Sequence, residues 1–167
     1  MSVYSIDRLM QEARRLAVEY RRSTGKTLPV SGELAVYDAI RLLGLEPAPE
    51  GSRGFDAIRR HGAGFDRLQV KARVIFDDTR RGHRIGQLQA GAEWDGVLLV
   101  LMDEAYEPSE ILQADRAAVL EALEASADSR RANRGAMSVA RFRIIGRRVW
   151  ARESGREDDA GAGLGPR

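Results

Sequence analysis

Three polar residues in the middle of the chain have types and a spacing that could support chemistry. Asp56 lies near the start of one expected strand, and Gln69 and Lys71 lie two residues apart on the next. Alternate residues of a strand point to the same face, so Gln69, Lys71 and Arg73 share one face. This face offers an amide oxygen and an ammonium group, and Asp56 offers a carboxylate on the neighbouring strand.

Lys71 is unusual because the chain has 27 basic residues and only two of them, Lys26 and Lys71, are lysines. A charged lysine in the middle of an apolar strand must reach water or a partner. Its ammonium group is a compact donor whose pKa shifts readily on burial. The guanidinium of an arginine lacks both properties and cannot replace it. A purely structural interpretation is that Asp56 caps a turn of an ordinary hairpin and Lys71 extends its amine to water.

An Asp, a short hairpin and then Gln-x-Lys resembles the signature of the PD-(D/E)XK nuclease superfamily. That group includes many restriction endonucleases, Holliday-junction resolvases and Mrr-type enzymes. The resemblance maps Asp56 to the first acidic position, Gln69 to the second position and Lys71 to the lysine. Glu33 maps to the helix that often supplies a further carboxylate. The run 31–150 also resembles an uncharacterised bacterial family placed among these proteins.

The resemblance implies a Mg²⁺ or Mn²⁺ ion that polarises a phosphodiester and activates water. Its expected ligands are hard oxygens. They come from the side chains of Asp56 and Gln69, the Val70 backbone carbonyl and, through water, Glu33. Lys71 would orient the attacking water or stabilise charge on the phosphate. Glu33, Asp56, Gln69 and Lys71 are thus the expected catalytic residues.

Gln69 stands where the superfamily usually has Asp or Glu, so the site carries one negative charge less. Gln occurs there in Mrr-like members, in which the helix Glu is thought to compensate. Two hypotheses follow from the resemblance. The chain is a metal-dependent DNA endonuclease, or it is a catalytically decayed module of the same fold that binds nucleic acid or a protein partner.

Two helices are expected to precede this site. The apolar spacing predicts a helix that begins at Ile6, is capped by Ser5 and stops at Gly25. Arg14, Arg15, Glu19 and Arg21 are expected on its wet side. Its apolar side is expected to consist of Ile6, Leu9, Met10, Ala13, Leu16, Ala17 and Tyr20. Ser31 is expected to cap the second helix, and Gly44 to close it.

The centre of the chain is predicted to be rich in strands. Strands are expected over 54–60 and 66–76, antiparallel around a turn at 61–64, with loops over 46–51 and 77–92. The apolar run 96–102 predicts a strand buried on both faces, followed by a short strand over 110–114. A helix is expected over 116–126. The stretch 138–150 is ambiguous, and we favour a short helix begun by Ser138 with an extension to Trp150.

These elements predict one α/β domain with three or four strands in a mixed sheet flanked by helices. The resemblance implies a restriction-endonuclease-like core over residues 31–152. Residues 1–30 would form an N-terminal helix packed on that core. Residues 153–167 are rich in Gly, Ala and charge, and we expect them to be disordered.

The charge is divided unevenly along the chain. Residues 85–127 carry nine acids and one arginine, a net −8, whereas 128–152 carry eight arginines and one Asp, a net +7. The basic stretch could contact DNA or fold against the acidic one. For DNA, phosphate contacts are expected from Arg73, Ser138, Arg141 and Arg147.

Composition also excludes several classes of protein. The chain has no Cys, which excludes disulfides and Cys-based zinc sites. No apolar run approaches the roughly 20 residues of a membrane span, so we expect no membrane partner and a cytoplasmic location. Cutting both strands of a duplex takes two sites, which favours a homodimer. A partner protein would have to supply sequence specificity.

Overall fold

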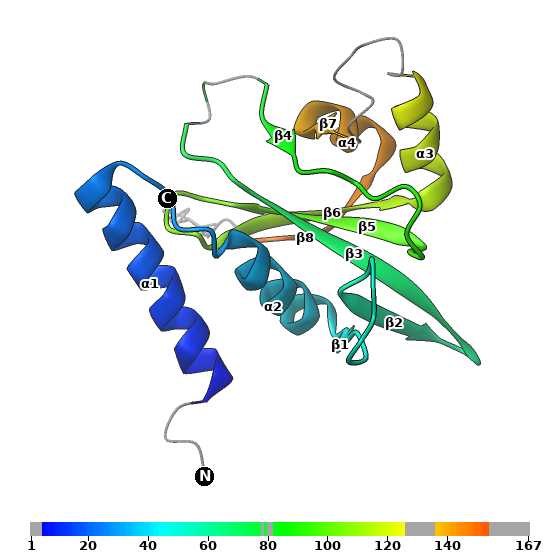
Figure 1. Cartoon of the computed structure of the whole chain (residues 1–167), viewed down its shortest axis with the longest axis horizontal. Coiled ribbons are helices and arrows are strands. Elements are labelled where there is room, and N and C mark those ends of the chain that lie inside the picture. The colour runs from blue at the N-terminus through cyan, green and yellow to red at the C-terminus, as the bar shows by residue number, and fades with distance from the viewer. Residues whose placement is uncertain (1–4, 78, 80–81, 126–135, 154–167) are drawn as a thin grey trace, which may run out of the picture.

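The computed structural model describes residues 5–77, 79, 82–125 and 136–153 (Figure 1). Four helices and eight strands lie in these ranges. The helices are α1 (Ile6–Thr24), α2 (Ser31–Leu43), α3 (Arg116–Ala125) and α4 (Val139–Ile145). The strands are β1 (Glu46–Pro47), β2 (Ala57–His61), β3 (Gly64–Val74), β4 (Arg84–Ile85), β5 (Gly96–Met102), β6 (Pro108–Asp115), β7 (Met137–Ser138) and β8 (Arg147–Ala151).

Six strands form one mixed sheet in the order β1-β2-β3-β5-β6-β8. β3 and β5 are parallel, and the other neighbouring pairs are antiparallel. β4 and β7 form a separate antiparallel pair. Every residue of β5 is buried, as the continuous apolar run predicts. The α/β class and the mixed sheet are therefore confirmed.

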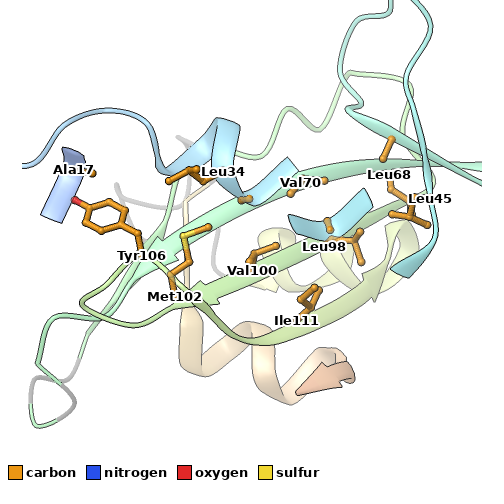
Figure 2. Packing of buried hydrophobic residues seen from close by; sticks show 13 residues of the cluster. Ala17, Leu34, Leu45, Leu68, Val70, Leu98, Val100, Met102, Tyr106 and Ile111 are labelled. Atoms are coloured by element: carbon orange, nitrogen blue, oxygen red, sulfur yellow. The ribbon is translucent and has the colours of Figure 1, made fainter. Parts of the chain in front are cut away.

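The sheet has an apolar core on each face. The first core joins α1 and α2 to side chains such as Leu68, Val70 and Val100 (Figure 2). The second core joins α3, α4 and the β4–β7 pair to Val97 and Leu99. Figure 1 shows the two groups of helices on opposite sides of the sheet. Successive residues of a central strand therefore enter different cores.

The prediction of three or four strands is wrong for the sheet, which contains six. One extra strand, β1, lies in the segment expected to be a loop over 46–51 and pairs with β2. The other is β8, which lies in the segment expected to extend the helix to Trp150 and pairs with β6. β4 likewise lies in the expected loop over 77–92. Such short strands exist only through their pairing, so local sequence patterns do not reveal them.

The boundaries of α4 follow from two local features. The Ser138 hydroxyl accepts a hydrogen bond from the Arg141 amide at 3.1 Å, as expected of an N-cap. At Gly146 the chain passes so close to β6 that a Cβ atom would lie 2.8 Å from the Gln113 carbonyl oxygen. The helix therefore begins where predicted and ends at the one residue type that permits this approach.

The orientation of α1 differs from the prediction. Its buried residues are Arg14 and Ala17, whereas Ile6, Leu9 and Leu16 are 62, 46 and 58 % exposed. The Arg14 guanidinium donates to both carboxylate oxygens of buried Asp38, at 2.8 and 3.1 Å, and to the Tyr106 carbonyl. Met10, Ala13 and Ala17 of the predicted stripe do pack against the first core. Arg14 joins them through this ion pair, while the rest of the stripe stays outside, so the buried side of α1 is displaced from the predicted one.

The ends of the first two helices largely match the predictions. Ser5 caps α1, and Gly25 and Gly44 end α1 and α2 in the left-handed conformation. The expected cap of α2 is wrong by one residue, because Ser31 is already helical. Val30 holds the N-cap position without a side-chain hydrogen bond. Of the expected disordered tail, residues 154–167 lie outside the described residues.

Candidate active site

The candidate site lies where β2 separates from β3. Backbone pairing between these strands extends from His61↔Gly64 to Ala57↔Leu68, whereas β3 continues to Val74. In the described part of the chain, no strand pairs with residues 69–74 on the side of β3 away from β5. An open edge of about six residues therefore begins beside Asp56.

Asp56 occupies the fork between the two strands. Its amide donates to the Leu68 carbonyl at 2.9 Å, and its carbonyl accepts from the Ala48 amide at 3.0 Å. Its Oδ2 accepts a hydrogen bond from the Val70 amide at 2.8 Å. The carboxylate thus takes the place that a backbone carbonyl of β2 would hold in a longer ladder. The Val70 carbonyl faces the same side, because the two backbone groups of a strand residue point to one neighbour.

Gln69 is buried beside this fork, with 6 % of its surface exposed. Its Oε1 atom is buried and accepts no hydrogen bond from the described residues. A buried acceptor without a partner costs roughly 1–3 kcal/mol, so such atoms are rare in native proteins. The described residues thus leave the hydrogen-bonding capacity of this oxygen unused.

Lys71 follows Gln69 on the same face of β3 and is half-buried. It pairs in register with Leu99, which belongs to the second core. Burial lowers the pKa of the Lys71 amine below its ordinary value, and the nearby Asp56 carboxylate opposes this effect. Desolvation has the larger effect, so the Lys71 amine loses its proton at a lower pH than the amine of an exposed lysine does.

A close contact between loops holds the fork in place. Gly54 has a φ of +83°, and a Cβ atom on it would lie 2.4 Å from the Cβ of Ala92. The guanidinium of Arg116 pins the segment around Ala92, because it donates to the carbonyls of Ala90, Ala92 and Trp94 at 2.7–2.8 Å. It also stacks on the Trp94 ring.

An ion pair sets the register of β3 against β5 on the other side of the site. Both the Arg67 amide and its guanidinium donate to the Asp95 carboxylate, at 2.7 and 3.1 Å for Oδ2. The guanidinium lowers the pKa of the Asp95 carboxyl group below its ordinary value. This pair precedes the parallel ladder that begins at Leu68↔Gly96 and aligns the strands that carry Gln69 and Lys71.

Glu33 lies apart from these residues. It is exposed in the first turn of α2. That helix covers the face of the sheet that carries Leu68 and Val70, whereas Gln69 and Lys71 point to the other face. The structure thus brings together Asp56, Gln69, the Val70 backbone and Lys71, and places Glu33 on a different layer. A role for Glu33 stays a prediction.

The four residues expected to contact phosphates lie in different places. Arg73 follows Lys71 on β3, and Ser138 and Arg141 belong to the layer that covers the same face. Arg147 lies on the edge strand β8, three strands or about 14 Å from β3. Part of the basic stretch instead pairs with the acidic one. Arg143 contacts Glu110, and Arg152 lies 3.0 Å from Asp103.

The donor set at the fork suits a hard cation only in part. Asp56 contributes the one carboxylate, while Gln69 and Val70 contribute neutral oxygens. The Gln69 oxygen, which has no partner among the described residues, fits a cation that prefers oxygen ligands. Over the described ranges, no cluster of three or more His, Asp or Glu side chains could hold a metal ion. A cation here would therefore depend on solvent or substrate for its remaining ligands.

Sequence reasoning missed two residues near the far end of β3. Arg21 of α1 and His83 line a cavity together with Arg73. The residue pattern hides Arg21 because its helix is rotated relative to the apolar stripe. It could have been suspected from its spacing of seven residues from Arg14, which puts both arginines on one side of the helix.

Comparison with known proteins gives no relative: no protein-family model matches the chain, and no curated protein matches it. Among the described helices, none has the length and apolar character needed to cross a membrane.

Proposed function

We propose that this protein is a metal-dependent nuclease that hydrolyses phosphodiester bonds of DNA, with a restriction-endonuclease-like core. The observation that carries the proposal is the fork of β2 and β3. There Asp56 accepts a hydrogen bond from the Val70 amide and lies near the half-buried Lys71 amine. Gln69, between Leu68 and Val70 on the same strand, has a buried oxygen without a partner among the described residues. These are the groups that the resemblance to PD-(D/E)XK nucleases selects.

The residues of the fork have distinct tasks in this proposal. Asp56, Gln69 and the Val70 carbonyl would hold Mg²⁺ or Mn²⁺, which supplies Lewis-acid activation of the phosphoryl group and of water. Lys71 donates a hydrogen bond to the attacking water or to a phosphate oxygen as negative charge builds on it. The open edge of β3 gives a phosphodiester access to these groups, because no strand pairs there in the described part of the chain.

The proposal is tested by assaying the purified full chain on supercoiled, linear and single-stranded DNA with Mg²⁺ or Mn²⁺. Lys71→Ala should lower the cleavage rate at least 100-fold. Lys26→Ala is the matched control, since Lys26 is the other lysine and is exposed, and it should leave the rate unchanged. Absence of cleavage of any DNA form with either metal would refute the proposal.

A second variant separates metal binding from folding. In Asp56→Asn the amide oxygen can still accept the Val70 hydrogen bond, so the hairpin should keep its fold. The variant loses the one carboxylate of the set and should lose the heat of Mn²⁺ binding in calorimetry. An unchanged Mn²⁺ titration would show that the cation binds elsewhere.

The second candidate is a catalytically decayed module of this fold that binds nucleic acid or a protein partner. The position of Glu33 favours it, because Glu33 lies exposed on the layer opposite Lys71 while Gln69 is neutral. This candidate predicts no Mn²⁺ heat in the wild-type chain. It also predicts DNA or partner binding that Lys71→Ala leaves unchanged.

A further inference from the structure

A cavity of about 550 Å³ lies at the end of β3, beyond Lys71. Volumes of this size are typical of pockets for small ligands. Its lining combines three separate parts of the chain: Arg21 of α1, the end of β3, and the segment that follows it. The lining residues are Arg21, Arg73, Val74, Phe76, Asp77, Gly82 and His83.

Two arginines give the cavity its character. The Arg21 guanidinium lies 3.5 Å from the centroid of the Phe76 ring, a cation–π contact that holds it in place. The Arg73 Nε atom is buried and has no hydrogen-bond partner among the described residues. Over the same residues, neither guanidinium forms an ion pair with a carboxylate. Most buried guanidinium donors are paired, so this arrangement suits an external anion.

The acidic group in the lining does not cancel this charge. The Asp77 Oδ1 atom accepts a hydrogen bond from the Thr79 amide at 2.9 Å, so this carboxylate oxygen stabilises the local turn. The His83 ring nitrogen lies 3.4 Å from the Asp77 carbonyl oxygen. Among the described lining residues, two guanidinium groups stand against one carboxylate, so the sum of their charges is positive even when His83 is neutral.

We propose that this cavity binds the phosphoryl group of a nucleotide, either free or within a nucleic-acid strand. A guanidinium offers a fork of donors that matches phosphate oxygens, and Arg21 and Arg73 line this cavity from two separate elements. Arg73 lies two residues after Lys71 on β3, so a phosphate bound at Arg73 lies toward the far end of the unpaired stretch of β3 that begins at the fork. The inference rests on the cavity and does not require the proposed reaction.

Calorimetric titration of the full chain in EDTA tests this proposal without metal or cleavage. The probes are inorganic phosphate, deoxythymidine 5′-monophosphate and a short single-stranded thymidine oligonucleotide. Arg21→Gln and Arg73→Gln should each weaken binding at least tenfold. Arg22→Gln is the matched control, because Arg22 is adjacent on α1 and pairs with Glu19 at 3.2 Å, and it should bind like the wild type.

The probes distinguish the source of the phosphate. Tighter binding of the oligonucleotide than of the mononucleotide assigns the site to a nucleic-acid strand, and the reverse order assigns it to a free nucleotide. Either result supports the cavity as a phosphate site. Absence of binding by all three probes would overturn it, as would an equal loss in Arg22→Gln, which indicates diffuse attraction to surface charge.

A measurement on the wild-type chain covers the case in which Arg73→Gln does not fold. Phosphate should shift the NMR signal of the Arg73 Nε–H group, and an unmoved signal at saturating phosphate would contradict the proposal. Lys71→Ala separates this site from the proposed nuclease. It should abolish cleavage and retain phosphate binding, so either proposal can fail while the other stands.

Discussion

Two groups of buried polar side chains lie on opposite faces of the sheet and differ in how their hydrogen bonds are satisfied. On the face covered by α1 and α2, Arg14 and Asp38 form a bidentate pair, and the Tyr106 carbonyl accepts a further bond. The Tyr106 hydroxyl is the one buried side-chain atom of this core without a partner among the described residues. On the other face, the row formed by Gln69, Lys71 and Arg73 leaves two buried atoms without partners among the described residues. The first group holds α1 and α2 to the sheet, while the second contains the groups to which we assign a ligand in our proposals.

The largest effect should come from breaking the satisfied pair. Asp38→Asn removes the buried counterion of Arg14 and, among the described carboxylates, leaves it only the partly exposed Glu107, 3.5 Å from its Nε atom. Removal of one member of a buried pair is strongly destabilising. We expect the free energy of unfolding in urea to fall by about 3 kcal/mol. Glu19→Gln, which removes an exposed ion pair on the same helix, should change it little. A loss below about 1 kcal/mol for Asp38→Asn would mean that the pair does not anchor α1.

Two buried glutamines allow a sharper comparison of the same kind. Gln113 is 7 % exposed and its Oε1 accepts a hydrogen bond from Arg59 at 2.8 Å, whereas the Gln69 oxygen has no partner in the described residues. Gln113→Leu should lower the free energy of unfolding by about 1–3 kcal/mol, because it leaves the Arg59 guanidinium without this acceptor. Gln69→Leu should lower it by less than about 1 kcal/mol or raise it.

The order of these two losses is the decisive result, measured by urea unfolding of both variants in parallel. An equal or larger loss in Gln69→Leu would show that the Gln69 amide stabilises the fold, and the contrast between the two faces would fail.

The smallest effect concerns pH. Burial lowers the pKa of the Lys71 amine below 10.5, so between the two pKa values the unfolded chain binds more protons than the folded one. Stability therefore rises with pH through this window and is lost as pH falls through the folded pKa. Lys71→Met removes this dependence. Its advantage in free energy of unfolding over the wild type should shrink as pH approaches 10.5, and a constant difference would contradict the burial of Lys71.

Long periodic segments were predictable, whereas short strands were not. The apolar run 96–102 and the helix that begins at Ile6 carry their signal locally, and both appear in the structure as expected. β1, β4 and β8 have two to five residues each and depend on partners that lie far away in sequence. Their existence is a property of pairing rather than of local propensity.

Part of the candidate site was predictable from the sequence, namely the part carried by one strand. The alternation of β3 put Gln69, Lys71 and Arg73 on one face, and the register of β3 with β5 agrees. The layer on which Glu33 lies, and the contribution of Arg21 to the cavity, depend on how α1 and α2 pack. The rotation of α1 is set by Arg14 and Asp38, which are 24 residues apart.

The sequence by itself determined the chemistry available to this protein: one lysine and one neutral amide on a strand face, with an aspartate one hairpin away. Tertiary structure decided which groups are left without partners. Whether a buried oxygen or guanidinium nitrogen is satisfied depends on neighbours from other strands and helices, and the chain brings these together only when it folds. The open edge of β3 arises in the same way, since β2 separates from it at Asp56.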